Sequence, residues 1–411
     1  MASVERLPRE TSIDLVRGAD VLLMLFVNEM AGVRGTPAFL LHKAHDVDGM
    51  TITDVVFPAF LFITGLAIPF ALGGRLRRGD TGGVWRHILT RTIALLAMGV
   101  LMVNAERPGT GGLISADLWS VLMGVGVVLV WLAPPRDGPP ARGQPWLRLA
   151  GAAVLVALVF LYRSRDATGL IQIRPQWWGI LGLIGWSYLV AASAYVLARD
   201  RPAALLGVVA LLYCVYLADE AGRASWLAAL APYFRVGRTM AAHSAVAVSG
   251  TLLGVMLLRH RQAGEPARTL VPPALGYASG LAAAGLLLHA LHGLHPAFSV
   301  SKVLATPPWC LLSSALTAAF WVGIFVLTDV NGWRRWPKAV SIAGENALLC
   351  YLMAPLLLSL FAVSAPLVGG SNFYERLGES TVIGFIRSTV FAWIVVRLCG
   401  LLRDAGVVMK I

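Results

Sequence analysis

Apolar segments of about 20 residues recur from one end of the chain to the other, and they constrain its fold more than any other feature. A helix of this length crosses the hydrocarbon core of a bilayer, which is about 30 Å thick. The segments are continuous rather than alternating, which favours helices over the strands of a membrane barrel. Only 14% of the 411 residues are charged, whereas a soluble domain carries about 25%. The sequence therefore predicts an all-α, polytopic helical bundle in a lipid bilayer.

We expect about 11 or 12 membrane spans in a single transmembrane domain that covers residues 1–411, with a short cytoplasmic segment at 1–12. Linkers rich in Gly and Pro separate the spans, because these residues end helices. No internal repeat is visible, which disfavours a transporter built from two matching halves. The predicted spans are 13–32, 51–73, 87–104, 117–134, 147–162, 178–198, 203–218, 241–258, 271–291, 309–328, 340–362 and 380–402.

The distribution of Lys and Arg predicts the orientation of these spans. If the N-terminus is cytoplasmic, the inner segments carry about twice as many positive residues as the outer segments, as the positive-inside rule requires. Both termini are then cytoplasmic, and the loop that contains His42 lies on the outer side. The net charge of +12 follows from this bias, so we expect no nucleic acid as a partner.

The first predicted span carries more polar groups than a membrane helix normally tolerates. Four of its polar residues lie within about 120° of arc at 100° per residue; they are Asp14, Arg17, Asp20 and Asn28. Ionisable groups in a membrane helix usually face the bundle interior and often mark a functional path. Arg17 can also form a structural ion pair three residues away with either carboxylate. Asn28 can donate to a developing oxyanion or make an interhelical hydrogen bond.

The following loop carries two histidines, His42 and His45. An imidazole there can take a proton from an attacking amine or hydroxyl, or accept an acyl group itself. A solvated loop histidine is the alternative, and spacing alone does not choose between the two. Asp54, one turn into the next span, can orient a histidine, bind a sugar hydroxyl or cap the helix.

Other candidate residues lie at the outer ends of later spans. Trp177 and Trp178 fit an aromatic belt, and they can also stack on a sugar. Lys302 is a cation near the outer membrane surface that can meet an acid or a phosphate. The triplet His289, His292 and His295 is spaced for one helical face, but no carboxylate lies nearby, so we interpret it as a helix end and expect no metal.

On the inner side, arginines can hold phosphate groups, although positive-inside anchoring is the simpler interpretation of any single one. The segment 341–352 places Glu345 and Asn346 at membrane depth, where a carboxylate needs a partner. The sequence contains no phosphate-binding P-loop, no GxSxG elbow and no HExxH motif. ATP-driven transport, serine hydrolysis and zincin chemistry are therefore poorly supported.

Three passages resemble the transmembrane acyltransferase family typified by heparan-α-glucosaminide N-acetyltransferase. They are SIDLVRGADVLLMLFVN with the later DGMTITDVVFPAFLFITGLAIPFAL, then WWGILGLIGWSYLV, and finally VSKVLATPPWCLLSSA through TDVNGWRRW to AGENALLCYL. The resemblance implies transfer of an acetyl group from cytoplasmic acetyl-CoA to the amine of a terminal glucosamine on the far side. It also implies that the family's catalytic histidine and asparagine match His42 and Asn28, and that its acid matches Asp54.

The sequence differs from the family at one point. In the family, fewer residues separate the histidine from the glycine that corresponds to Gly49. The corresponding distance here falls on Ala44, between His42 and His45. We prefer His42, because the LLH run resembles bacterial relatives more closely.

We therefore predict an integral-membrane acetyltransferase of the bacterial cytoplasmic (inner) membrane that acts on an amino-sugar amine or a sugar hydroxyl. Acetyl-CoA is the expected co-substrate, and a homodimer is considered. The predicted catalytic residues are His42 (general base or acetyl carrier), Asn28 and Asp54. The predicted substrate-binding residues are His45, Asp48, Trp177, Trp178, His243 and Lys302. The predicted cofactor-binding residues are Arg17, Arg91 and Asn346.

The rival hypothesis is a proton- or ion-coupled transporter or flippase of a sugar-containing substrate. Under this hypothesis, charged residues in the spans form an ion path and His42 acts as a gate; the path residues are Asp14, Arg17, Asp20 and Glu345. A third hypothesis is a structural partner in cell-envelope synthesis with no chemistry of its own.

Overall fold

The structure is a computed structural model, and its regular elements are all helical in the part of the chain that it describes. Ten of these helices are long and apolar enough to cross a membrane. This confirms the predicted polytopic helical bundle and identifies an integral membrane protein. The described residues are 10–44, 46–106, 108–109, 112–133, 144–164, 169–228, 230, 234–368, 370, 372–409 and 411.

Each of the twelve predicted spans corresponds to a helix. The long helices are α1 (Thr11–Met30), α2 (Ile52–Arg77), α3 (Thr81–Ala105), α4 (Ala116–Val130), α5 (Gln144–Leu161), α6 (Ile180–Ala198), α7 (Pro202–Glu220), α9 (His243–Ala263), α10 (Val271–His289), α11 (Pro307–Phe325), α13 (Ala347–Ser364) and α15 (Thr381–Asp404). The short helices are α8 (Ser225–Ala228), α12 (Lys338–Glu345) and α14 (Phe373–Arg376).

Two of the twelve predicted spans are helices that fall short of the composition or length of a membrane helix. Helix α1 is 20 residues long, but Asp14, Arg17, Asp20 and Glu29 make it too charged to be one of the ten apolar helices. Helix α4 is apolar but only 15 residues long. The predicted span 340–362 is also divided, because the chain leaves helical geometry at Asn346 between α12 and α13.

The chain forms two compact units. The first unit contains residues 1–20, 42–95 and 183–336, and the second contains 21–41, 96–182 and 337–411. The divisions fall inside α1, α3 and α6, so each of these helices contributes residues to both units.

Helices α2 and α9 form the closely packed centre of the first unit. A Cβ atom on Gly65 would lie 1.8 Å from the carbonyl oxygen of Ala247, and one on Gly250 would lie 1.9 Å from that of Phe62. Only glycine therefore permits this approach, and small residues at helix contacts are typical of membrane bundles. The hydroxyl of Thr251 donates to the Gly65 carbonyl across the contact, at 3.2 Å. The contact fixes the ends of α2 and α9 relative to each other.

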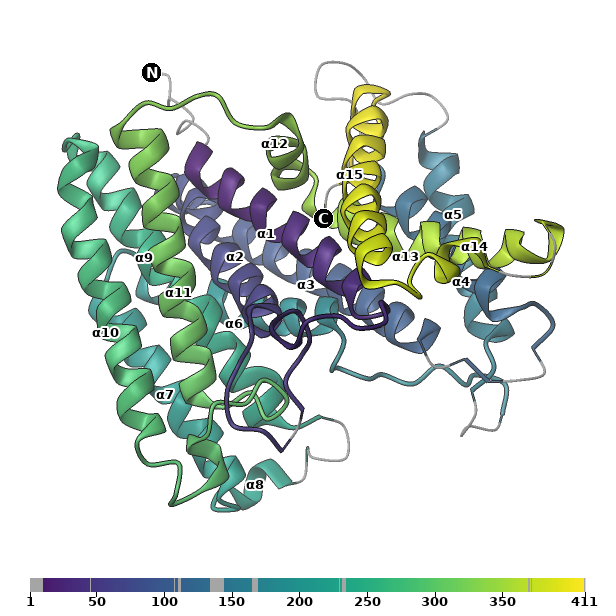
Figure 1. Cartoon of the computed structure of the whole chain (residues 1–411). Coiled ribbons are helices and arrows are strands. Elements are labelled where there is room, and N and C mark those ends of the chain that lie inside the picture. The colour runs from purple at the N-terminus through teal and green to yellow at the C-terminus, as the bar shows by residue number, and fades with distance from the viewer. Residues whose placement is uncertain are drawn as a thin grey trace. The chain divides into compact units, whose positions relative to one another are not determined.

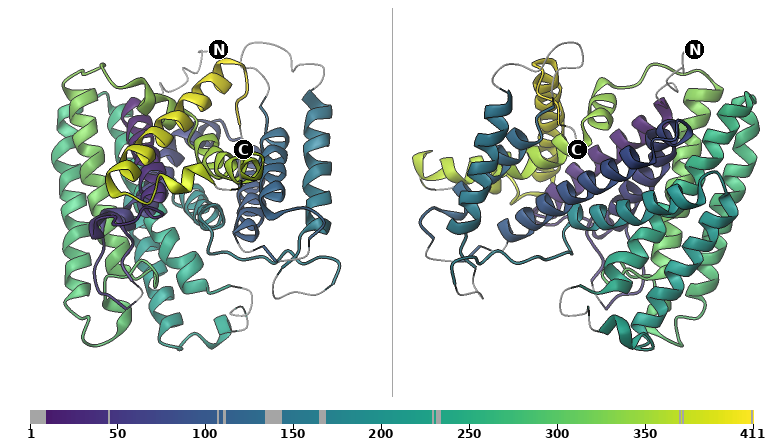
Figure 2. Two further views of the ribbon diagram at one scale, coloured as in Figure 1. Left: turned by 45° about the vertical axis from the view of Figure 1, so that its right-hand side comes forward. Right: turned by 180° about the vertical axis from the view of Figure 1, so that it is seen from behind.

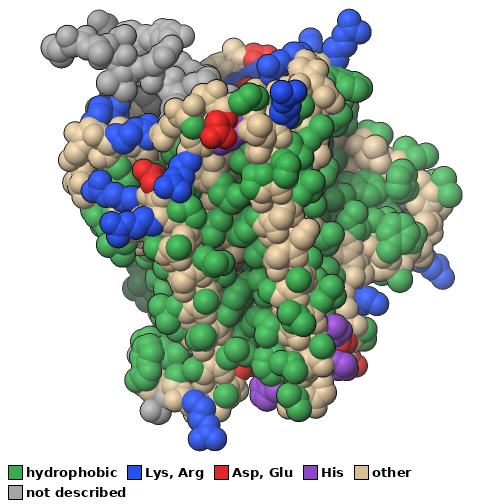
Figure 3. All heavy atoms as spheres, turned by 90° about the vertical axis from the view of Figure 1, so that its left-hand side faces the viewer, with side chains coloured by type: hydrophobic (Ala, Val, Ile, Leu, Met, Phe, Trp, Pro, Cys, Tyr) green, Lys and Arg blue, Asp and Glu red, His purple; other side chains and the backbone are tan. Residues whose placement is uncertain are grey.

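Helices α9, α10 and α11 run side by side in the first unit (Figures 1 and 2). On the face that includes α10, hydrophobic side chains form a broad band, with Lys and Arg gathered at one end and histidines at the other (Figure 3). Leu286, Leu287, Leu316 and Phe320 are exposed large hydrophobic residues of α10 and α11. A band of this kind suits contact with lipid chains.

Candidate functional site

The start of α2 fixes the carboxylate of Asp54. The side chain is 1% exposed, and its Oδ2 accepts hydrogen bonds from the N–H groups of Thr51 at 3.0 Å and Lys43 at 3.2 Å. The Thr51 bond is that of a capping box, and the Lys43 bond ties the His42 loop to the start of the helix. The other oxygen, Oδ1, lies 2.8 Å from Nδ1 of His42. Capping the helix and orienting a histidine, two of the roles considered for Asp54, are therefore both present in one side chain.

His42 and Lys302 meet at this carboxylate. The Nζ atom of Lys302 lies 3.0 Å from Nδ1 and 3.1 Å from Nε2 of His42. The His42 side chain is 46% exposed, so the group is open to solvent on one side. Burial lowers the pKa of Lys302 to about 8, and the charge of Asp54 opposes this shift. We call His42, Asp54 and Lys302 the His42 site.

The loops that carry His42 and Lys302 are joined by backbone bonds around Asp48. Its Oδ1 accepts a bond from the Val300 N–H at 2.8 Å, and the Gly49 N–H donates to the Val300 carbonyl at 2.9 Å. The second oxygen of Asp48 lies 3.7 Å from Nδ1 of His289. Asp48 therefore holds the two loops together, which is a structural contribution beside its predicted contact with substrate.

His243 lies behind the site at the start of α9, directly after the π-helical turn η2 (Val236–Ala242). Its Nδ1–H donates to the Arg238 carbonyl at 2.6 Å, and its ring lies 5.6 Å from that of Phe57 and 6.1 Å from that of Trp309. Trp309 is fully buried and donates to the Asp54 carbonyl at 3.2 Å. Trp309 was not among the predicted site residues, although its position after two prolines at a helix start could have indicated it.

The first unit thus brings together five of the predicted site residues, namely His42, Asp48, Asp54, His243 and Lys302. His45 lies outside the described residues. Asn28, which is exposed, and Trp177 and Trp178 belong to the second unit. Trp178 is 47% exposed and donates to the side chain of Gln176 at 2.8 Å.

Arg91 has the environment most suggestive of an anion site among the three predicted cofactor residues. It lies about 15 Å along α3 from its start, near the middle of the helix. Its guanidinium lies 4.7 Å from the ring centre of Tyr188. Its buried Nε has no hydrogen-bond partner among the described residues, and a charge at this depth normally has one.

The other two predicted cofactor residues have local partners. Arg17 pairs with Asp14 at 2.9 Å, so it takes one of the two carboxylates considered for it. The side chain of Asn346 donates to the Ile342 carbonyl at 3.2 Å. Its neighbour Glu345, whose partner the sequence did not indicate, pairs with Arg403 at 2.9 Å.

The second unit contains a buried polar cluster that sequence reasoning missed. The Tyr374 hydroxyl donates to the Glu29 carboxylate, and Arg387 donates to the Glu29 carbonyl at 2.9 Å and to the Tyr374 carbonyl at 3.1 Å. The Arg387 guanidinium also lies 4.5 Å from the centre of the Tyr374 ring. We call these residues the Glu29 cluster. A Glu and an Arg inside two predicted spans were the available indication of it.

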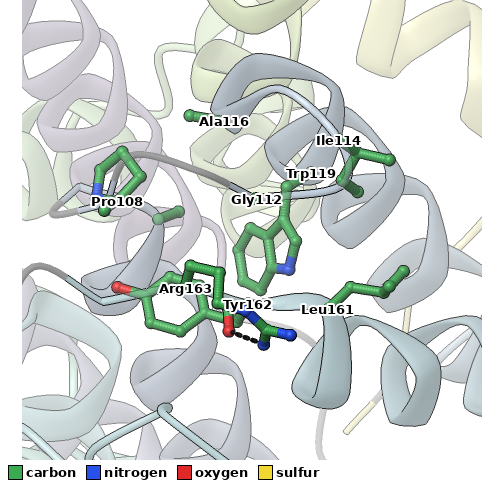
Figure 4. Close-up of a pocket in the computed structure, with 10 residues that line it drawn as sticks. Pro108, Gly112, Ile114, Ala116, Trp119, Leu161, Tyr162 and Arg163 are labelled. Atoms are coloured by element: carbon green, nitrogen blue, oxygen red, sulfur yellow. Dashed lines mark hydrogen bonds between the residues drawn. The ribbon is translucent and has the colours of Figure 1, made fainter. Parts of the chain in front are cut away.

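A small pocket in the second unit lies between the segments around Pro108, Trp119 and Tyr162 (Figure 4). Its volume of about 20 Å³ holds about one water molecule. The polar groups around it are already bonded: Tyr162 donates to the Asn104 carbonyl at 2.9 Å, and Trp119 to the Leu158 carbonyl at 3.0 Å. The pocket is therefore too small for an acyl donor or a sugar.

The three outer histidines lie at a helix end, as the sequence indicated, and not along one helical face. The sequence showed no carboxylate nearby, but the fold brings Asp48 to 3.7 Å from His289. Helix α10 ends at His289, and His292 lies in the following turn. The Nδ1 atom of His295 accepts a bond from the Ala297 N–H at 3.1 Å at the start of a short 3-10 helix. Within the described residues, no group of three or more His, Cys, Asp or Glu is placed to hold a metal ion.

Comparison with known proteins gives a partial match. No protein-family model matches the chain. The chain is 34% identical over 98 residues to human heparan-alpha-glucosaminide N-acetyltransferase, which is 24% of this chain and 14% of the human protein. It is 33% identical over 93 residues to the mouse protein of the same name, which is 22% of this chain and 13% of the mouse protein. These matches confirm the resemblance indicated by the sequence motifs: over about a quarter of its length, the chain is similar to heparan-alpha-glucosaminide N-acetyltransferases.

Proposed function

We propose that the protein is an integral-membrane acetyltransferase that moves an acetyl group from acetyl-CoA to the amine or a hydroxyl of an amino sugar. The observation that carries the proposal is the contact of the buried Asp54 carboxylate with a solvent-accessible His42. The names of the partly matching human and mouse proteins support the same chemistry and a glucosamine acceptor.

In this proposal the Asp54 carboxylate sets the tautomer of His42. Nδ1–H donates to Asp54, so Nε2 carries the lone pair, as in the histidine of a Ser-His-Asp triad. Nε2 then takes the proton of the attacking amine or hydroxyl, which contributes about 10²–10⁴-fold to the rate. Nε2 can alternatively carry the acetyl group itself between donor and acceptor.

The proposed orientation puts the His42 site outside and acetyl-CoA inside. His243 at the start of α9 and Arg261 in its last turn are about 27 Å apart, close to the thickness of the hydrocarbon core. At the Arg261 end, the guanidinium binds Glu10 and Asp329. Both termini are then cytoplasmic, in a bacterial inner membrane. Arg91, whose buried Nε has no hydrogen-bond partner among the described residues, is available to a CoA phosphate group from that side. Arg17 and Asn346 stay predicted cofactor-binding residues.

The remaining predicted residues have proposed roles on the outer side. Asn28 donates to the acyl oxygen at the end of the first span. Trp177 and Trp178 provide ring faces for the sugar, and His45 and His243 contribute polar contacts to the acceptor.

An acetyl-transfer assay tests the proposal directly. Purified protein given acetyl-CoA and glucosamine-type acceptors should release free CoA thiol, and His42→Ala should reduce the rate about 10²–10⁴-fold. His45→Ala tests the neighbouring histidine and should raise the KM for the acceptor while it keeps most of kcat. Loss of activity in His45→Ala alone would move the catalytic histidine to position 45. The absence of thiol release with every acceptor would overturn the proposal.

Transport of a sugar-containing substrate is the second candidate, and Asp20 favours it. This residue of α1 is 6% exposed, and its Oδ2 has no hydrogen-bond partner among the described residues. A buried carboxylate of this kind is typical of ion paths in transporters. Counterflow of a labelled sugar across proteoliposomes without CoA, abolished in Asp20→Asn, would favour transport over acetyl transfer.

A further inference from the structure

The loop between α10 and α11 holds Lys302 in a fixed position. The Thr306 hydroxyl accepts a bond from the Ser301 N–H at 3.0 Å, and the Thr306 N–H donates to the Ser301 carbonyl at 3.1 Å. The Ala305 N–H donates to the Lys302 carbonyl at 3.0 Å, with Ala305 at a φ of +51°, a conformation that non-glycine residues seldom adopt. These bonds position the residue before any substrate binds.

A second element braces the same loop from the side. The Tyr216 hydroxyl of α7 donates to the Leu304 carbonyl at 2.9 Å, and both Ser301 and Thr306 are buried. A preorganised donor of this kind loses little freedom when it binds a reacting group.

Lys302 faces one carboxylate and two imidazoles. They are Asp54, His42 and His243, the last close enough for its charge to interact with that of Lys302. The nearby Arg238 side chain is already paired with Glu220, at 2.6 Å. The ammonium has three N–H donors, of which at most two face His42. One is therefore left for a ligand, and it lies beside the nitrogen at which the acyl group would react.

We propose that the Lys302 ammonium is a catalytic group that binds the acyl oxygen while the acetyl group is transferred at His42. This inference rests on the proposed acetyltransferase function. Donors that stabilise an oxyanion lie about 2.7–3.1 Å from it. The acyl carbon must lie on Nε2 of His42 or on the nucleophile that Nε2 deprotonates. Its oxygen is then within reach of Nζ, which is 3.1 Å from Nε2.

The step balances without a further reactant. The acceptor amine attacks the thioester carbon, and the carbonyl π electrons move to the oxygen, where Nζ–H donates to the negative charge. Nε2 of His42 takes the amine proton. The carbonyl re-forms as the C–S bond breaks, and the thiolate recovers that proton from His42. Lys302 keeps its own proton throughout, so it acts only when charged.

This role has a defined pH dependence. The pKa of Lys302 is lowered from 10.5 to about 8, so the ammonium loses its proton at a lower pH than an ordinary lysine does. The turnover number should therefore fall as the pH rises through about 8. Arginine keeps its charge well above this range, so Lys302→Arg should lose this alkaline fall.

The test measures kcat, KM and the pH profile of acetyl transfer to a glucosamine acceptor for the full-length protein. Lys302→Met should reduce kcat about 10²–10³-fold, as for the loss of one oxyanion donor, with little change in KM. Lys302→Arg should recover part of kcat and keep it to higher pH. Lys338→Met, at an exposed lysine at the start of α12, is the matched control and should behave as the wild type.

Two outcomes separate this inference from the proposed function. If the wild type transfers acetyl groups while Lys302→Met keeps both the full kcat and the alkaline fall, the role of Lys302 is wrong and the function stands. If the wild type transfers none, the proposed function itself fails. If Lys302→Met does not fold, the pH profile of kcat for Lys302→Arg is the test. A fall in kcat near pH 8 that is the same as in the wild type would contradict the proposal.

Discussion

The His42 site and the Glu29 cluster use similar residue types to opposite effect. In each, a buried carboxylate meets a hydrogen-bond donor and a cation. In the Glu29 cluster, Glu29, Tyr374 and Arg387 are all less than a tenth exposed. In the His42 site only Asp54 is buried to that degree, whereas the His42 side chain is 46% exposed. We therefore expect exposure of the partner, and not the carboxylate itself, to distinguish a reactive group from a structural one.

The surroundings of the two groups explain this difference. Aromatic rings enclose Tyr374, with Phe361 and Phe391 each at 5.3 Å, and the bonds of Arg387 end on backbone carbonyls of the same unit. The Lys302 ammonium instead contacts the exposed imidazole of His42. A substrate group can take the place of that imidazole as the partner of the ammonium. We therefore expect substitutions in the His42 site to affect the rate, and those in the Glu29 cluster to affect stability.

The largest expected effect is that of Asp54→Asn on acetyl transfer. The amide can still accept one hydrogen bond at the start of α2. It is not charged, however, and no longer fixes the tautomer and orientation of His42 through Nδ1. The rate should fall about 10²–10⁴-fold, measured as CoA thiol release.

Thr51→Ala is the control for that change, because it removes the hydroxyl that donates to Oδ2 of Asp54 at 3.1 Å and keeps the charged carboxylate whose Oδ1 contacts His42. It should lower stability by about 1 kcal/mol and leave the rate of the folded protein nearly unchanged. An equal loss of rate in both variants would show that Asp54 acts through the helix start alone.

Next in size is the effect of Arg387→Met on stability. The change removes the cation beside Glu29 and leaves a buried carboxylate uncompensated, which lowers stability by about 3–5 kcal/mol. Thermal unfolding in detergent measures this loss. Folded Arg387→Met protein should transfer acetyl groups at the wild-type rate per molecule. A loss of this rate without a loss of stability would show that the Glu29 cluster takes part in the reaction.

A smaller loss is expected for Tyr374→Phe. The ring and its packing are kept, and only the hydroxyl that donates to Glu29 is removed. One buried acceptor left without its donor lowers stability by about 1–3 kcal/mol, measurable in the same unfolding experiment. Phe373→Leu, at an exposed neighbouring ring, serves as the control, and an equal effect of both would argue against the hydrogen bond as the cause.

The smallest effect is expected for His289→Asn. The ring lies 3.7 Å from Asp48 and is 33% exposed, and ion pairs of this kind contribute about 0–1 kcal/mol. The rate should stay within about twofold of the wild type in the acetyl-transfer assay. A large loss would extend the functional site from His42 to the end of α10.

The local parts of the fold and of the site could be predicted from the sequence. Runs of apolar residues long enough to cross a bilayer give helices at all twelve predicted positions, since helix formation and membrane depth depend on neighbouring residues. The proximity of His42 and Asp54 was also foreseeable, because only twelve positions separate them and a carboxylate at a helix start accepts nearby donors. The contact of Asp48 with His289 was not foreseeable, because the two residues are far apart in the sequence.

Tertiary structure alone decided which distant groups join this local pair. Lys302 and Trp309 reach His42 and Asp54 across more than 250 positions of the chain. Their arrival depends on the register of α11 against α2 and α9, and on the loop bonds at Asp48. No local pattern specifies such a register, because it results from packing between helices whose apolar faces look alike in sequence. The sequence determined that this is a helical membrane protein with a histidine beside an acid, and the packing of its helices determined which cation stands beside that histidine.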